Sequence, residues 1–121
     1  MTGLVDTNIL IDILRGYPRA VRWMQTNSSL ELWIPSIVRM ELVAGCKTKS
    51  ELRSAIQLVK PLQTVLINEQ DAAWAMEKFE TFHLSHSVEI PDCFLAALSV
   101  RLRVPVYTRN TKDLLVFQSV Q

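Results

Sequence analysis

Short apolar runs alternate with longer segments of helical periodicity along most of this chain. The apolar runs lie at residues 4–5, 32–34, 64–67 and 104–107. Strands that alternate with helices are joined by crossovers, which gives a parallel sheet covered by helices on both faces. Strands buried on both faces are themselves apolar, as these runs are. The sequence therefore predicts an α/β fold around a short parallel sheet of about four to five strands.

Residues with known preferences for helix ends indicate where the helices begin and stop. Thr7 or Asn8 is suited to cap a first helix and Ser36 a later one, and Asn68 with Asp71 three residues on resembles a capping box. Stop signals follow three of the helices, at Gly16, Gly45 and Pro61. The helices are expected over about residues 9–14, 18–24, 36–44, 52–59, 69–82 and 90–100, with a helical turn at 111–115.

Two of these helices carry apolar residues at i, i+3, i+4 and i+7, the spacing of a buried face. In the fourth helix they are Leu52, Ala55, Ile56 and Val59. In the fifth helix they are Ala72, Ala75, Met76 and Phe79. We expect both sets to face the core.

Length and charge narrow the class of protein. The 121 residues, without a repeat or linker, predict a single domain over 1–121. No apolar run approaches the roughly 20 residues of a membrane helix, so a cytoplasmic protein without membrane contact is expected. The net charge of +1 argues against coating nucleic acid by bulk electrostatics, but it allows local basic strips. Cys46 and Cys93 lie far apart in the sequence and are expected to be reduced, mostly buried thiols.

Three carboxylates stand out because they lie within apolar segments. Asp6 follows the first strand, Glu41 lies inside the third helix, and Asp92 opens the sixth. A buried carboxylate needs a partner, a metal or a raised pKa. Each acid alone is equally well explained as a helix cap or half of an ion pair. Together at strand ends they favour an oxygen-rich site for Mg²⁺ or Mn²⁺.

The remaining acids have simpler interpretations. Asp71 is expected at a helix start, where the helix dipole favours it. Asp12 lies on the first helix, six residues beyond Asp6, and we leave its direction open. The others are expected to be solvated helix residues or loop and strand-edge charges, namely Glu31, Glu51, Glu69, Glu77, Glu80 and Glu89.

The ordered motifs of this chain resemble those of PIN-domain ribonucleases, most of all the VapC toxins of type II toxin–antitoxin pairs. The matching segments are LVDTNILIDIL (4–14), IPSIVRMELVAG (34–45), IPDCFLAALSVRLRVPVYTRN (90–110) and TKDL (111–114). They span almost the whole chain in the order and spacing of that family. The resemblance implies a single PIN domain.

The resemblance also implies a set of site residues. Asp6, Glu41 and Asp92 fall on family acids that hold the divalent ion. Family members carry a fourth group after the last strand, and here either Asp113 or Asn110 can fill that position. Three polar residues match positions that orient the acids or bind phosphate, namely Thr7, Asn8 and Thr108.

The function implied is a Mg²⁺-dependent endoribonuclease, with Mn²⁺ as an alternative ion. A metal-activated water would hydrolyse the RNA phosphodiester and leave a 5′-phosphate. Arg15, Arg109 and Lys112 are the candidate contacts to the RNA backbone, with Arg101 and Arg103 further from the site. Family members are dimers neutralised by a small antitoxin, so a homodimer with such a partner is expected. The alternatives are a non-catalytic nucleic-acid-binding or interaction module of the same fold, and a metal-dependent DNA nuclease or phosphatase.

Overall fold

A computed structural model describes residues 1–109 of the chain, and the described part contains four strands and six helices. The strands are β1 (Gly3–Val5), β2 (Leu32–Pro35), β3 (Gln63–Val65) and β4 (Val106–Tyr107). The helices are α1 (Thr7–Leu14), α2 (Pro18–Thr26), α3 (Ser36–Ala44), α4 (Lys49–Val59), α5 (Glu69–Phe82) and α6 (Ile90–Leu102). The predicted α/β alternation is confirmed. The expected helical turn at 111–115, and with it Asn110, Lys112 and Asp113, lies outside the described residues.

The four strands form one parallel sheet in the order β3-β2-β1-β4. The chain first builds outward from β1 through β2 to β3, and then returns to place β4 on the other side of β1. Gly3 and Leu4 of β1 lie opposite Leu32 and Trp33 of β2, while Val5 lies opposite Tyr107 of β4. The strand order therefore reverses between β1 and β4, which is where open α/β sheets place their ligands.

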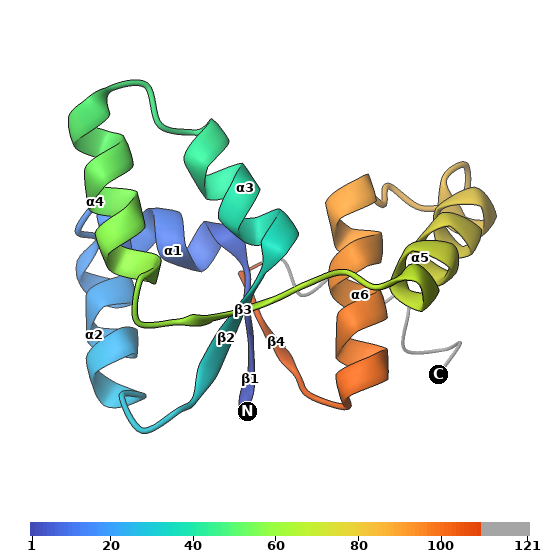
Figure 1. The fold of residues 1–121 in the computed structure, drawn as a ribbon, viewed down its shortest axis with the longest axis horizontal. Helices are drawn as coiled ribbons and strands as arrows, with labels where there is room; N and C mark the ends of the chain where they lie inside the picture. Colours follow the sequence, from blue (N-terminus) through green and yellow to red (C-terminus); the bar gives the residue numbers. More distant parts are fainter. Residues whose placement is uncertain (110–121) are drawn as a thin grey trace.

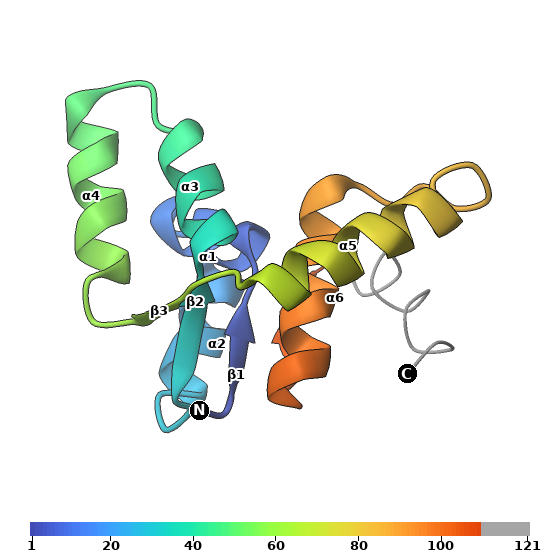
Figure 2. The same ribbon diagram turned by 45° about the vertical axis from the view of Figure 1, so that its right-hand side comes forward.

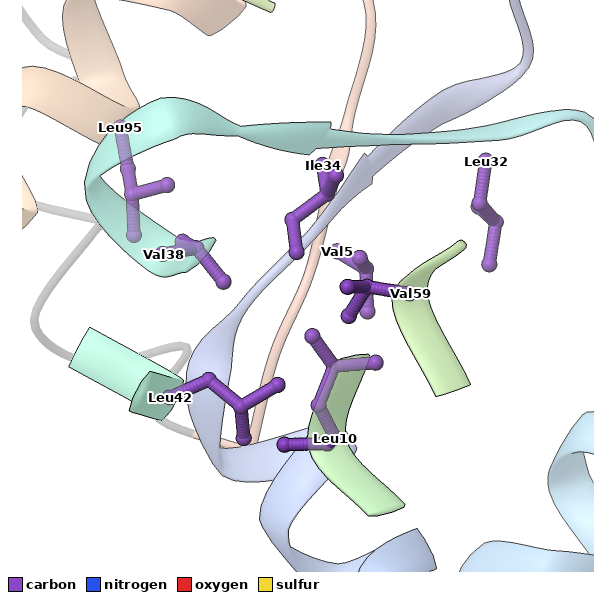
Figure 3. Packing of buried hydrophobic residues seen from close by; sticks show 9 residues of the cluster. Val5, Leu10, Leu32, Ile34, Val38, Leu42, Val59 and Leu95 are labelled. Carbon is purple, nitrogen blue, oxygen red and sulfur yellow. The ribbon is translucent and has the colours of Figure 1, made fainter. Parts of the chain in front are cut away.

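Helices cover both faces of the sheet, so that the strands separate two groups of helices (Figure 1). Helices α1 to α4 lie on one side, and the α5–α6 pair lies on the other (Figure 2). The larger core cluster joins Val5 and Ile34 of the strands to Leu10 of α1, Val38 of α3 and Val59 of α4 (Figure 3). On the opposite side Leu4, Val65 and Leu98 form a second cluster, and α5 packs on α6 through a third.

Close approach of β4 explains one glycine of β1. A Cβ on Gly3 would lie 2.5 Å from Cε2 of Tyr107 and 2.9 Å from the carbonyl oxygen of Pro105. Gly16 has a different role, because its φ of 70° lies in the left-handed region that turns the chain from α1 into α2. Gly3 thus permits the close packing of β4 on β1, and Gly16 permits the turn between α1 and α2.

Two of the expected helix caps differ from the structure. The N-cap of α1 is Asp6, whose side chain accepts a hydrogen bond from the Thr7 N–H, and not Thr7 or Asn8. The N-cap of α3 is Pro35 without a side-chain cap, and Ser36 is already helical. Each helix follows its strand directly, so the last residue before the helix is the N-cap. Helix α1 therefore begins at Thr7, before the expected residue 9, whereas α3 begins at the expected residue 36. The predicted Asn68–Asp71 capping box is confirmed.

The predicted inner faces of α4 and α5 are partly wrong. Ala55, Val59 and Ala75 are buried as expected, but Ile56 is 42% and Met76 is 61% exposed. Helix α4 packs on α1 and α3, and α5 packs on α6, so in each helix the buried stripe is narrower than the apolar stripe. No helix among residues 1–109 is long and apolar enough to cross a membrane.

Candidate active site

Asp6 lies at the carboxyl end of β1, beside the end of β4. Its Oδ2 accepts a hydrogen bond of 2.7 Å from the Thr108 hydroxyl, and its Oδ1 accepts one of 2.7 Å from the Thr7 N–H. The side chain is buried at 8% exposure. Asp6 is also the N-cap of α1, so its side chain satisfies a backbone N–H of the first helical turn. The carboxylate is therefore held rigidly at the point where the strand order reverses.

Asn8 ties the start of α1 to the chain that follows β4. Its Nδ2 donates to Thr108 Oγ1 at 3.1 Å, and its Oδ1 accepts from the Arg109 N–H at 3.2 Å. A longer contact of 3.5 Å joins Asn8 Nδ2 to Asp6 Oδ2. The structure thus places all three predicted polar residues of the described chain, Thr7, Asn8 and Thr108, around Asp6.

Glu41 approaches from α3 and is linked to Asp6 through Thr7. The Thr7 hydroxyl donates to Glu41 Oε1 at 3.0 Å, while the Thr7 N–H donates to Asp6. Burial raises the pKa of the Glu41 carboxyl, the Thr7 hydrogen bond lowers it, and the negative charges of Asp6 and Glu89 raise it further. The net pKa of Glu41 is raised. Negative charge at this place is therefore costly without a cation.

Asp92 occupies the first turn of α6, where it takes part in helix capping. Its Oδ2 accepts a hydrogen bond of 3.1 Å from the Glu89 N–H. Within residues 1–109, no three Asp, Glu, His or Cys side chains group closely enough to hold a metal ion. The described chain therefore brings Asp6 and Glu41 together, and it does not add Asp92 to them as a third member of such a group.

The donor chemistry of the Asp6–Glu41 pair fits Mg²⁺. This ion keeps several of its waters and is commonly bound through one or two carboxylates together with substrate phosphates. Thr7 joins both acids near the carboxyl end of β1, and burial followed by the charges of Asp6 and Glu89 raises the pKa of Glu41, a cost that a bound cation would relieve. The fourth predicted position, Asp113 or Asn110, lies outside the described residues.

Glu89 is a neighbour of the site that sequence reasoning missed. It was expected to be a loop or strand-edge charge, and it does precede α6 as its exposed N-cap. Its charge nevertheless acts on Glu41, 48 positions earlier in the chain. Its position three residues before Asp92 was the one local signal that Glu89 lies near the site. Its effect on Glu41 depends on the tertiary fold and leaves no sequence pattern.

The candidate RNA-binding arginines occupy different surroundings. Arg15 is the C-cap of α1, at the end of the helix opposite Asp6, and lines a cavity of about 480 Å³ with Lys47 of the α3–α4 connection. Arg109 follows Thr108, and its Nε lies 2.9 Å from Oδ2 of Asp12. The structure thus places Arg109 beside the acids and Arg15 away from them. Lys112 lies outside the described residues.

Arg101, considered as a more distant phosphate contact, is held by an acid instead. Its Nε and Nη2 lie 2.8 and 2.9 Å from the two carboxylate oxygens of Asp71. Asp71 is only 2% exposed, far more buried than a helix-start residue needs to be. This pair fixes the start of α5 against the last turns of α6.

Comparison with known proteins places the chain in a family. The sequence profile described as PIN domain matches residues 3–117. The chain belongs to the PIN domain family. It is 27% identical over 121 residues to ribonuclease VapC19 of Mycobacterium tuberculosis strain H37Rv, an alignment that covers 98% of this chain and 96% of the relative.

Solved structures agree with this assignment of the fold. A toxin-antitoxin complex from Klebsiella pneumoniae contains a chain of 26% identity with a TM-score of 0.74, covering 92% of this PIN domain and 88% of that chain. VapBC-1 from nontypeable Haemophilus influenzae gives a TM-score of 0.79 at 20% identity and covers 98% and 94%. The second likeness concerns the fold alone.

Proposed function

We propose that this PIN domain is a metal-dependent endoribonuclease that acts as the toxin of a VapBC-type pair. The observation that carries the proposal is the Asp6–Glu41 pair, joined through Thr7 at the reversal of strand order. Two carboxylates held together there, with the pKa of Glu41 raised, form a site suited to a divalent cation. The likeness to ribonuclease VapC19 supports RNA as the substrate.

The protein's own side chains would orient the reaction. When bound, Mg²⁺ would lower the pKa of a water and offset the charge that develops on the phosphate. Thr7 and Thr108 hold both oxygens of Asp6 in place, so little reorganisation is needed. Asp6 and Glu41 would hold the cation. We propose Asp92 and either Asp113 or Asn110 as the further ligands, with Mn²⁺ as an alternative ion.

The test is cleavage of a panel of single-stranded RNAs by the purified protein, with Mg²⁺ or with EDTA. We expect Mg²⁺-dependent products with 5′-phosphate ends. The Asp6→Asn variant should lose at least about 100-fold in rate, because a carboxylate that holds the cation is removed. Glu77→Gln, the same kind of change at a 70% exposed glutamate of α5, should cut like the wild type. Undiminished cleavage by Asp6→Asn would refute the site.

One observation favours a second candidate, a non-catalytic nucleic-acid-binding module. Within the part of the chain that the structure describes, Asp92 does not join Asp6 and Glu41 in a group able to hold a metal. Titration with Mg²⁺ and Mn²⁺ by calorimetry separates the two candidates. RNA binding without metal binding or cleavage would establish the module, and cleavage of DNA with RNA spared would indicate a DNA nuclease.

The proposed partners are a small antitoxin and a second copy of the chain. The Klebsiella pneumoniae structure of 26% identity is a toxin-antitoxin complex, which supports the first of them. Apolar side chains exposed on α3, Met40 at 70% and Val43 at 41%, are compatible with a protein interface. Analytical ultracentrifugation of the protein, alone and co-expressed with the product of a neighbouring small gene, tests both partners.

A further inference from the structure

Asp12 and Arg109 form an ion pair at the edge of the proposed catalytic site. Asp12 lies on α1 and is buried at 7% exposure, while the side chain of Arg109 remains 59% exposed. The contact of 2.9 Å runs from Nε of Arg109 to Oδ2 of Asp12. A buried carboxylate thus holds the inner part of a guanidinium group that is otherwise open to solvent.

The pair is continuous with the hydrogen bonds around Asp6. Asn8 and Asp12 are four residues apart on α1 and so share one helix face. The main-chain N–H of Arg109 donates to Oδ1 of Asn8, and the side chain of Arg109 pairs with Asp12. Asn8 also donates to the Thr108 hydroxyl, which in turn donates to Asp6. One face of α1 therefore fixes both the acid of the site and the arginine beside it.

The position of this arginine answers an electrostatic problem of the site. Asp6, Glu41 and Glu89 place negative charge together, so a positive side chain at the rim favours the approach of an RNA phosphate. An arginine fork matches phosphate geometry, and an arginine that is already held loses less conformational entropy on binding. Arg101 lacks this property, because Asp71 engages both its Nε and its Nη2.

We propose that Asp12 is a positioning residue that presents the Arg109 guanidinium to a phosphate of the RNA next to the Asp6 carboxylate. This inference rests on the proposed ribonuclease function. It assigns Asp12 a role that its distance from Asp6 in sequence left open. Asp12 acts through Arg109 and does not itself contact the substrate.

The experiment is steady-state cleavage of a single-stranded RNA by the full chain in Mg²⁺, repeated over a range of salt concentrations. Arg109→Gln should raise KM roughly tenfold with kcat nearly unchanged, the loss of one hydrogen bond to a charged group. The slope of log(1/KM) against log[salt] should become shallower by about 0.7, the value for one phosphate contact on a single strand. Asp12→Asn keeps the arginine charge, so KM should rise roughly threefold with an unchanged slope.

A double-variant cycle tests whether Asp12 acts through Arg109. In the Arg109→Gln background, adding Asp12→Asn should raise KM no further. The double variant leaves no unpaired buried charge, so it remains measurable even where a single variant folds poorly. If the double variant showed the KM and the salt slope of the wild type, the inference would be overturned and the pair would serve only to stabilise the fold.

Arg53→Gln is the matched control. It removes one exposed positive charge on α4, from a residue that has no place in the candidate site. Its KM and salt slope should equal those of the wild type, and a change equal to that of Arg109→Gln would reduce the effect to overall charge and overturn the inference. Absence of RNA cleavage by the wild type refutes the proposed function instead, so the two failures are distinguishable.

Discussion

The molecule buries carboxylates at the start of α5 and at the start of α1, and the two places differ in how the charge is met. Asp71 has the Arg101 guanidinium against both of its oxygens and the Asn68 N–H as a further donor. Asp6 and Glu41 share the donors of Thr7, and within residues 1–109 neither of them forms an ion pair with a basic side chain. The first place is complete as a structural tie. In the second, no basic side chain of the described residues balances the charge, so an added cation would relieve it.

Removing the arginine from the Asp71–Arg101 pair should lower the free energy of unfolding the most. Arg101→Ala leaves Asp71 buried without its ion-pair partner, and we expect the free energy of unfolding to fall by about 3 kcal/mol. Urea denaturation measures it. Arg103→Ala, two residues along and without a buried acid, should change stability by less than about 0.5 kcal/mol. Equal effects of the two variants would remove the distinction between the two acidic places.

Removing the negative charge of Glu41 should instead raise the free energy of unfolding. Glu41→Gln keeps the Thr7 hydrogen bond and removes the repulsion by Asp6 and Glu89, so in EDTA the protein should gain up to about 1 kcal/mol, limited by solvent screening. The same variant should lose the stabilisation that Mg²⁺ gives the wild type. Thermal unfolding with and without Mg²⁺ measures both, and Glu77→Gln is the control. A less stable Glu41→Gln in EDTA would contradict the proposed imbalance.

The pH dependence of that gain follows from the raised pKa of Glu41. The folded protein holds this proton more tightly than the unfolded chain, so protonation of Glu41 stabilises the fold, and that contribution is lost as pH rises through the raised pKa. The stability difference between Glu41→Gln and the wild type in EDTA should therefore shrink between pH 7.5 and pH 5. Denaturation at these two values checks it. A constant difference would show that Glu41 titrates normally.

The smallest effect is expected at the donor that joins the two acids. Thr7→Val removes the hydroxyl that donates to Glu41 and should lower the free energy of unfolding by about 0.5–1 kcal/mol in EDTA at pH 7.5. The loss should be smaller at pH 5, where Glu41 is closer to neutral. Thr81→Val, an exposed threonine of α5 whose hydroxyl bonds the Glu77 carbonyl, should show no pH dependence. The same pH dependence of stability in both variants would show that the Thr7 hydroxyl does not act on the carboxylate of Glu41.

Much of the fold could be predicted from the sequence because the strands are short, apolar and separated by good helix signals. The Asn68–Asp71 capping box is a local pattern and is found as expected. The exposure of Ile56 and Met76 was not predictable, because it depends on which other helices pack against α4 and α5. Local sequence therefore specified the elements, and packing decided which apolar residues are covered.

The site was predictable only in part for a similar reason. Asp6 was marked by its place between a strand and a helix, and the structure adds the donors that hold it. The electrostatic effect of Glu89 on Glu41 acts between residues 30 or more positions apart, and the ion pairs of Asp71 and Asp12 with arginines also join residues at least 30 positions apart. No local pattern encodes such contacts. Asn110 and Asp113 remain predictions.

The hydrogen bond between Asp6 and Thr108 spans 102 positions of a 121-residue chain. During synthesis, Asp6 and Glu41 are made long before β4 can dock beside β1. A nascent chain therefore carries Asp6 and Glu41 without the threonine that orients them. For a protein proposed to cut RNA, the site is therefore assembled only after residue 108 has been made and β4 has docked beside β1.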